Sequence, residues 1–346
     1  MATWPDILMR LSFDEDLDAA ETAWMLDEVF NGRATDAQLG AFLMGMQTKG
    51  ATAPEVNGMV ETMLGHAAPL TIPGRSVDIV GTGGDKANTV NISTMASLVI
   101  AGAGLRVVKH GSRAASSTTG SSDVLAALGV NLELEPQRVA EVVEEVGITF
   151  CYAVKFHPAM RFAGPVRKEL GIPTIFNVLG PLTNPAQPAV SAIGASSAAL
   201  APVMARVLAM RGRDGMVFRN EDGLDELAAT AATRVWEVRD GVVTESVIDA
   251  AADLGLRPIP VEALRGGEAD ENAAVARSVL AGASGPVRET VIANAALAIA
   301  ADGTLPGTDA DDLVTRVLAG MAAAANAIDS GAADATLQRW AKATQH

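Results

Sequence analysis

The sequence is poor in cysteine, in aromatic residues and in basic charge. One cysteine, Cys151, among 346 residues excludes an internal disulfide and a cysteine-rich metal site, and it is typical of a reducing compartment. Lysine and arginine total 26 against 41 aspartates and glutamates, which gives a net charge of −15. Nucleic-acid and anionic-membrane binding need a positive face, so this charge argues against both. A small anionic substrate stays compatible, because a few local donors outweigh a distant net charge.

Long apolar runs and targeting signals are also missing. No uninterrupted apolar stretch is long enough to span a membrane. Residues 1–6 lack the basic start and apolar run of a signal peptide. Apolar residues still make up 49% of the chain, which is enough for a sizeable core, and the length fits one large or two smaller domains. We therefore expect a cytoplasmic globular protein.

The first seventy residues predict short helices and no strand. Thr35 followed by Gln38, and Thr52 followed by Glu55, are capping-box patterns that mark helix starts. The apolar residues between these two boxes recur at helical spacing, so they should face one core. An all-helical unit is therefore expected before residue 73.

Strands and helices alternate after Pro73, which favours an α/β fold with parallel strand pairs. The helical and α/β parts are expected to form separate domains with a cleft between them. Strands are predicted over 76–80, 105–108, 148–152, 190–194 and 215–218, helices over 93–101, 123–128 and from about 270 to the end, and a hairpin over 235–243.

A glycine-rich segment follows the first predicted strand. It reads D-I-V-G-T-G-G-D over 78–85, and Ser93 and Thr94 open the next helix. Glycines let the backbone approach a ligand closely, and N–H groups there and at a helix start bind phosphate oxygens. The segment matches neither a Walker loop nor a dinucleotide-binding fingerprint. Taken alone, it equally fits a plain turn with a helix cap.

A second polar segment, K-H-G-S-R-A-A-S-S over 109–117, follows the second predicted strand. Its two cations, histidine and three hydroxyls suit phosphate and pyrophosphate, although alone it also fits a polar surface loop. Another glycine-containing turn follows at 118–123. Polar clusters at two successive strand ends favour a ligand site, because open α/β sheets bind ligands at that edge.

Two further segments carry chemistry. The turn 222–226 ends in Asp225 and Glu226. Their oxygens suit Mg²⁺ if a pyrophosphate faces them; otherwise the segment fits a solvated acidic turn. Arg167 follows H-P-A-M-R at 157–161. It is suited to bidentate pairing with a carboxylate, but it also fits an exposed charge on the surface of a helix. The proline- and glycine-punctuated stretch 177–185 is predicted not to form a regular helix.

Together these motifs make the chain resemble the anthranilate phosphoribosyltransferases through essentially its whole length. The resemblance rests on G-T-G-G-D, N-x-S-T, K-H-G-x-R, H-P-A-M, N-x-L-G-P-L-x-N-P and L-D-E. It implies a nucleoside phosphorylase-like phosphoribosyltransferase fold: a small helical domain, 1–73, completed by part of 165–190, and a large α/β domain, 74–346, with a mainly parallel central sheet. It also implies a homodimer through the helical domains.

The implied reaction belongs to tryptophan biosynthesis. The amine of anthranilate would displace pyrophosphate, with inversion, from C1 of phosphoribosyl pyrophosphate (PRPP), giving N-(5-phosphoribosyl)anthranilate. Lys109, Asp225 and Glu226 would stabilise the leaving pyrophosphate electrostatically. No single general base is assigned, because the aromatic amine is neutral at pH 7.

The resemblance further implies ligand contacts for particular residues. Those that would bind PRPP are Gly81, Gly84, Asp85, Thr89, Asn91, Ile92, Ser93, Thr94, Lys109, Ser117 and Ser121. Those that would hold Mg²⁺ are Ser93, Asp225 and Glu226. Those that would line the acceptor site are Gly81, His110, Ser112, His157 and Arg167, with Arg167 on the acceptor carboxylate.

Two positions depart from the family pattern. Ser112 stands where the family has an asparagine that contacts the acceptor, so a different or larger aromatic acceptor is a second hypothesis. Arg219 and Asn220 replace the usual His-Gly or His-Ser before L-D-E; Arg219 would either alter pyrophosphate affinity or face solvent. A pyrimidine nucleoside phosphorylase is disfavoured because its H-S-T-G-G pattern is missing, and a nucleic-acid-binding relative because of the net charge.

Overall fold

The computed structural model of the protein describes residues 2–113 and 118–345. Four helices open the chain: α1 (Trp4–Ser12), α2 (Ala19–Phe30), α3 (Asp36–Lys49) and α4 (Ala53–Gly65). The expected capping boxes are formed, Thr35 with Gln38 at α3 and Thr52 with Glu55 at α4. Each box satisfies main-chain N–H groups that a helix start leaves unpaired, which fixes where these helices begin.

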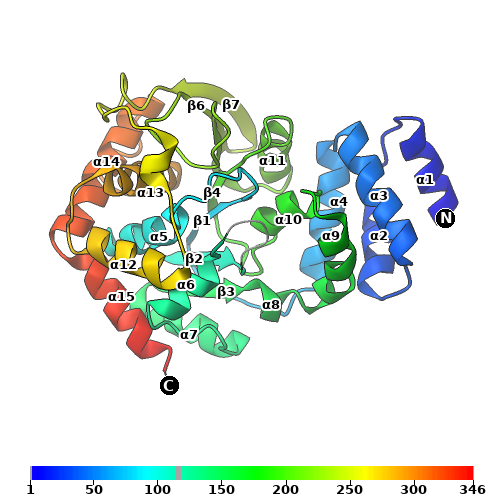
Figure 1. Ribbon diagram of the computed structural model, residues 1–346, viewed down its shortest axis with the longest axis horizontal. Coiled ribbons are helices and arrows are strands. Elements are labelled where there is room, and N and C mark those ends of the chain that lie inside the picture. The colour runs from blue at the N-terminus through cyan, green and yellow to red at the C-terminus, as the bar shows by residue number, and fades with distance from the viewer. Residues whose placement is uncertain (1, 114–117, 346) are drawn as a thin grey trace.

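One seven-stranded sheet forms the centre of the remaining chain, in the order β3-β2-β1-β4-β5-β6-β7. The strands β1 to β5 pair in parallel, and β6 and β7 add an antiparallel hairpin at one edge. The mainly parallel sheet beside a small helical unit confirms the predicted fold class (Figure 1). The strands are β1 (Val77–Gly81), β2 (Val107–Gly111), β3 (Ile148–Tyr152), β4 (Val190–Gly194), β5 (Asp214–Asn220), β6 (Thr233–Arg239) and β7 (Val242–Ile248).

Alternate strand residues face two different cores. One core lies between the sheet and the helices α5, α12, α13, α14 and α15. The second runs from the N-terminal helices through α10 and α11 to the other sheet face. The helices that cover the sheet are α5 (Ile92–Gly102), α11 (Ala201–Met210), α12 (Ala269–Leu280), α13 (Pro286–Asp302), α14 (Leu313–Asp329) and α15 (Ala332–Ala343).

Short helices connect the two parts of the molecule. In Figure 1, α9 lies beside the blue N-terminal helices, and it packs against α3. The remaining helices are α6 (Ser121–Ala127), α7 (Pro136–Val146), α8 (Ala153–Phe156), the 3₁₀ helix η1 (Pro158–Phe162), α9 (Gly164–Leu170), α10 (Phe176–Leu182) and the 3₁₀ helix η2 (Val261–Leu264). Across the described residues, no helix combines the length and apolar character that crossing a membrane requires.

Two local predictions are wrong. Lys109 and His110 belong to β2 and not to a loop after it, because in-register pairing with β3 carries the strand beyond its last apolar residue. Helix α10 occupies part of the stretch predicted to lack regular helix. Pro181 is accommodated because it is the sixth of only seven residues, so its missing N–H costs α10 one hydrogen bond in the last turn.

Candidate functional site

One cavity of about 570 Å³ collects most of the sequence-predicted site residues. It lies where β1 and β2 end, between the turn after β5 and the segment from α8 to α10. The predicted residues that line it are Gly81, Gly84, Asp85, Thr89, Asn91, Ile92, Ser93, Lys109, His110, Ser112, Ser121, His157, Arg167, Asp225 and Glu226. Their ligand contacts stay predictions, but the fold brings them to one place.

Two predicted PRPP residues are not among them. Thr94 is fully buried on α5 and is absent from the described lining of the cavity. Ser117 lies outside the described residues. The turn that follows it is tied to the start of α5, because the side-chain amide of Asn91, the N-cap residue, donates to the main-chain oxygen of Thr119 at 3.1 Å.

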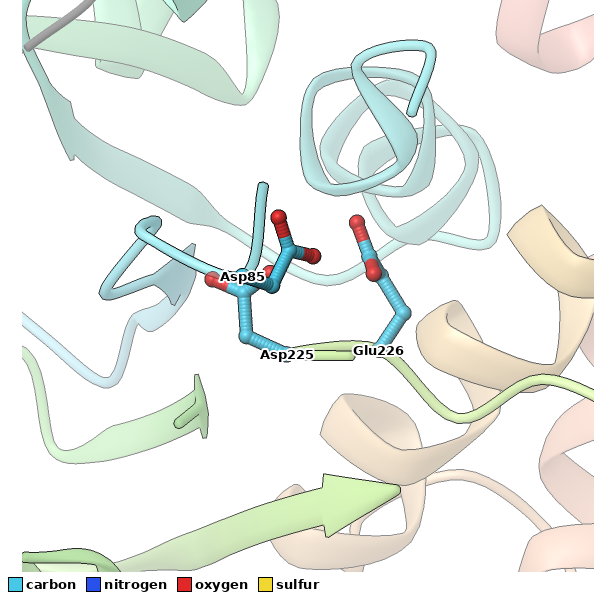
Figure 2. Close-up of side chains that lie close together, drawn as sticks. All are labelled: Asp85, Asp225 and Glu226. Atoms are coloured by element: carbon cyan, nitrogen blue, oxygen red, sulfur yellow. The ribbon is translucent and has the colours of Figure 1, made fainter. Parts of the chain in front are cut away.

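Three carboxylates that line the cavity converge. Figure 2 shows Asp225 and Glu226 on one loop and Asp85 on a facing loop. One oxygen from each lies within 4.8 Å of the other two. The Gly83 N–H donates to Oδ2 of Asp225 at 2.7 Å, and the Thr89 hydroxyl donates to Oε1 of Glu226 at 2.9 Å. Burial and mutual repulsion raise the pKa values of both Asp225 and Glu226.

The composition of this cluster differs from the predicted metal set. Asp85, predicted as a PRPP contact, completes the carboxylate group, whereas the Ser93 hydroxyl accepts a hydrogen bond of 3.2 Å from Nζ of Lys109. Within the described chain, Oε2 of Glu226 and Oδ2 of Asp85 are buried without a hydrogen-bond partner. Buried carboxylate oxygens without a donor are the atoms that a bound cation would satisfy.

Glycines make room for Asp225. A Cβ atom on Gly81 would lie 2.3 Å from Oδ2 of Asp225, and one on Gly194 would lie 1.7 Å from its main-chain oxygen. Gly194, at the end of β4, was not predicted as a site residue; its position as the last residue of a predicted strand was the only available signal. Gly83 and Gly84 adopt positive φ values of 63° and 88°, which glycine accepts without strain.

Lys109 is a buried cation with a buried counter-charge. Its ammonium donates to the main-chain oxygen of Ile79 and to Ser93. Burial lowers the pKa of Lys109 to about 8, although the negative charge of Asp78 acts in the other direction and raises it. Asp78 was also missed from the sequence: it accepts from the His110 N–H at 3.2 Å and from the Asn184 amide at 2.9 Å. Burial raises the pKa of Asp78 to about 6, so both groups are mainly charged at pH 7.

Two neutral histidines stand together in the cavity wall. The rings of His110 and His157 are 5.1 Å apart. Burial is the main cause that lowers the pKa of His110 to about 3 and that of His157 to about 4. Nδ1 of His110 lies 3.0 Å from the main-chain oxygen of Gly180, so Nδ1 carries the proton. Nε2 is therefore a hydrogen-bond acceptor, and it has no partner in the described part of the chain.

Cationic side chains also line the cavity. Arg167 stacks over the Phe176 ring at 5.1 Å and has no carboxylate partner among residues 2–113 and 118–345. Burial lowers the pKa of the Arg167 guanidinium from its ordinary value. Among the described lining residues, three are acidic and five are cationic: Lys86, Lys109, Arg113, Arg161 and Arg167. The cavity thus favours anions despite the acidic chain.

The residues that depart from the family pattern before the carboxylates have structural partners. Arg219 donates from Nε to the main-chain oxygen of Ser196 at 3.0 Å, and Asn220 is fully buried with its amide on the oxygen of Ala228 at 3.0 Å. Neither belongs to the described lining of the cavity. Ser112 does line it.

The fold and the cavity define a two-part glycosyl transferase. Residues 5–67 match the model of the helical bundle domain of a glycosyl transferase family, and residues 73–334 match that of its a/b domain. The chain is 56% identical to an anthranilate phosphoribosyltransferase of Streptomyces griseus, over 99% of this chain and 95% of that one. It is 53% identical to one of Rhodococcus opacus, over 99% and 93% of the two chains. The chain belongs to the anthranilate phosphoribosyltransferase family.

Solved structures agree with this assignment. The anthranilate phosphoribosyltransferase of Thermus thermophilus superimposes with a TM-score of 0.89 at 38% identity, covering 99% of this chain and 100% of that one. The Saccharomyces cerevisiae enzyme in complex with PRPP and Mg superimposes with a TM-score of 0.87 at 25% identity, covering 99% and 98%.

Proposed function

We propose that the protein transfers the phosphoribosyl group of PRPP to the amine of anthranilate, with Mg²⁺, releasing pyrophosphate. The observation that carries the proposal is that one cavity is lined both by a carboxylate cluster with Lys109 and by Arg167, which has no carboxylate partner among the described residues. The carboxylates and Lys109 suit a metal-bound pyrophosphate, and Arg167 suits an aromatic carboxylate. The family membership supports the same substrate pair.

The carboxylate cluster fits Mg²⁺. Asp85, Asp225 and Glu226 offer hard oxygen ligands, and two of their buried oxygens have no donor among the described residues. When bound, Mg²⁺ neutralises negative charge that builds up on the departing pyrophosphate. We assign Ser93 to the same group of residues through its contact with Lys109.

The chain's own groups bind and orient PRPP. Main-chain N–H groups of the glycine loop, residues 81–85, and the ammonium of Lys109 stabilise phosphate oxygens without reorganising, because the fold holds them in place before substrate arrives. Asn91 and Ser121, which line the same cavity, add neutral donors. These groups act on the leaving group, where charge develops during the transfer.

Arg167 and His110 orient the acceptor. The guanidinium of Arg167 pairs with the acceptor carboxylate, an interaction worth about 1.5–3 kcal/mol when charge-assisted. Nε2 of neutral His110 accepts a hydrogen bond from the acceptor amine, and its low pKa keeps it from adding a competing positive charge. Holding the amine in line with C1 supplies the main rate advantage, because the amine needs no prior deprotonation.

The helical part also carries a proposed dimer interface. Phe13, Met9 and Met44, on or next to α1 and α3, are 69%, 58% and 42% exposed. The helices α1 and α3 pack against each other, and exposed large apolar side chains on neighbouring elements favour burial against a partner. We propose a homodimer through a domain formed by residues 1–73 and completed by part of 165–190, with the rest of residues 74–346 as the second domain.

A turnover assay distinguishes this function from phosphoribosyl transfer to another aromatic acceptor. That alternative is suggested by Ser112, which lines the cavity where the family has an asparagine. Anthranilate fluorescence is followed with purified protein, PRPP and Mg²⁺. Loss of fluorescence that requires both PRPP and metal supports the proposed reaction. Intact PRPP binding without turnover refutes anthranilate as the acceptor. Recovery of turnover in Ser112→Asn would then show that this position selects the acceptor, and no Mg²⁺-dependent PRPP binding would refute the whole proposal.

A further inference from the structure

Asn294 is a polar residue in the middle of a buried apolar helix. Every residue of α13 from Val291 to Ala301 is buried, and Asn294 is 2% exposed among alanine, valine, isoleucine and leucine side chains. Burying an amide costs free energy unless its donors and acceptor are paired. The partners of Asn294 therefore indicate what the side chain is there to hold.

Both ends of the amide bind one residue of the loop that carries the carboxylates. Oδ1 of Asn294 accepts from the Leu227 N–H at 3.1 Å, and Nδ2 donates to the Leu227 main-chain oxygen at 2.8 Å. Nδ2 also donates to the oxygen of Thr290, one turn earlier, at 2.8 Å. Leu227 directly follows Glu226, so this two-point contact fixes the main chain next to the carboxylate cluster.

A second amide holds the same loop from β5. The Asn220 N–H donates to the main-chain oxygen of Leu224 at 3.0 Å, and its side chain donates to that of Ala228 at 3.0 Å. The main chain is thus held at Leu224, Leu227 and Ala228, on both sides of Asp225 and Glu226. We call residues 224–228 the carboxylate turn.

The carboxylate turn needs such support because repulsion between its negative charges opposes their close approach. Asp225, Glu226 and Asp85 gather oxygens within 4.8 Å, and each negative charge raises the free energy of the others. A lysine or arginine would neutralise the cluster but would compete with a bound cation. Uncharged amides hold the turn closed and leave the negative charge available.

We propose that Asn294 is a positioning residue for the metal site: it holds the carboxylate turn converged, so that Mg²⁺ meets a preformed set of ligands. The inference rests on the proposed Mg²⁺-dependent use of PRPP. Groups that orient metal ligands without touching the metal typically change metal affinity about 10- to 100-fold when removed.

The test compares Asn294→Leu, which keeps the approximate volume and removes both contacts with Leu227, with Asn294→Ser, which leaves room for water. Thr290→Val is the matched control, because it changes a buried side chain one turn away on α13 and leaves the main-chain oxygen of residue 290 in place. PRPP binding is measured by calorimetry at stepped Mg²⁺ concentrations, and thermal unfolding shows which variants are folded.

We expect both Asn294 variants to need about tenfold more Mg²⁺ for half-maximal PRPP binding. At saturating Mg²⁺ the PRPP affinity of both Asn294 variants should match that of the wild type. The Thr290→Val variant should match the wild type at every Mg²⁺ concentration. An unchanged Mg²⁺ requirement in a folded Asn294 variant overturns the inference, and so does a weakening that excess Mg²⁺ does not restore. Wild-type PRPP binding that needs no metal would instead refute the proposed function itself.

Discussion

A methyl group on Gly81 would lie 2.3 Å from Oδ2 of Asp225. Residues 81 and 225 are far apart in the chain, but the end of β1 and the carboxylate turn meet with no space between them. The same oxygen accepts from the Gly83 N–H at 2.7 Å. The glycine loop therefore sets the position of a carboxylate that the sequence places in a separate motif.

Replacing Gly81 by alanine should displace Asp225. The added methyl group overpacks this junction, which typically costs about 1–3 kcal/mol of stability. Mg²⁺-dependent PRPP binding should weaken about tenfold or more, since the ligand set is disturbed. Calorimetry measures both the metal requirement and the affinity. Gly65→Ala is the matched control, because a Cβ atom there meets no atom within 4 Å. Equal binding by the two variants would contradict the role of the close approach.

Arg167→Leu should act on the acceptor and leave PRPP binding intact. Losing a charge-assisted pair of about 1.5–3 kcal/mol corresponds to a rise in KM for anthranilate of about 10- to 100-fold. Steady-state kinetics with each substrate varied in turn makes the comparison. Lys168→Leu, the next residue on α9 and exposed to solvent, should behave like the wild type. A parallel rise in KM for PRPP would show that Arg167 does not discriminate between the substrates.

Replacing His110 by glutamine should reduce the loss of folding stability that occurs as the pH falls below 7. The folded protein holds the pKa of His110 at about 3, whereas the unfolded chain takes up a proton near 6.5, so His110 costs stability as the pH falls below 6.5. Between pH 7 and pH 5 the free energy of unfolding of the variant should therefore drop about 2 kcal/mol less than that of the wild type. Urea titrations at both pH values measure the difference. Identical drops would show that His110 titrates normally in the folded protein.

Phe13→Glu should shift the protein from dimer to monomer. Placing a charge in an apolar interface costs desolvation free energy on both subunits of a symmetric dimer. Sedimentation velocity over a range of concentrations gives the dissociation constant. Val242→Glu is the matched control, with a valine 63% exposed on β7, far from α1 in the sequence. Dissociation caused equally by both variants, or by neither, would place the interface elsewhere.

Local sequence determined much of the fold. The strands 148–152 and 190–194 have the predicted bounds, because short apolar runs bounded by glycine or by polar turns specify buried strands. The helix starts at Thr35 and Thr52 follow from capping groups within three residues. Helix α7, left unassigned, had a usable local signal in Pro136 at its first turn and Gly147 at its end, where φ is 81°.

The residue types of the site were also determined by sequence: the glycine loop, Lys109, the carboxylate pair and Arg167 all line the cavity. Their partners were decided only by the tertiary structure. Asp85 joins Asp225 and Glu226, Asp78 faces Lys109, and Asn294 pairs with Leu227 across 67 residues of sequence. A motif records which groups the chain carries, whereas strand order and helix packing decide which buried charges and amides meet. These contacts determine the geometry of the site because they are buried, and a polar group removed from water must find its partner within the protein.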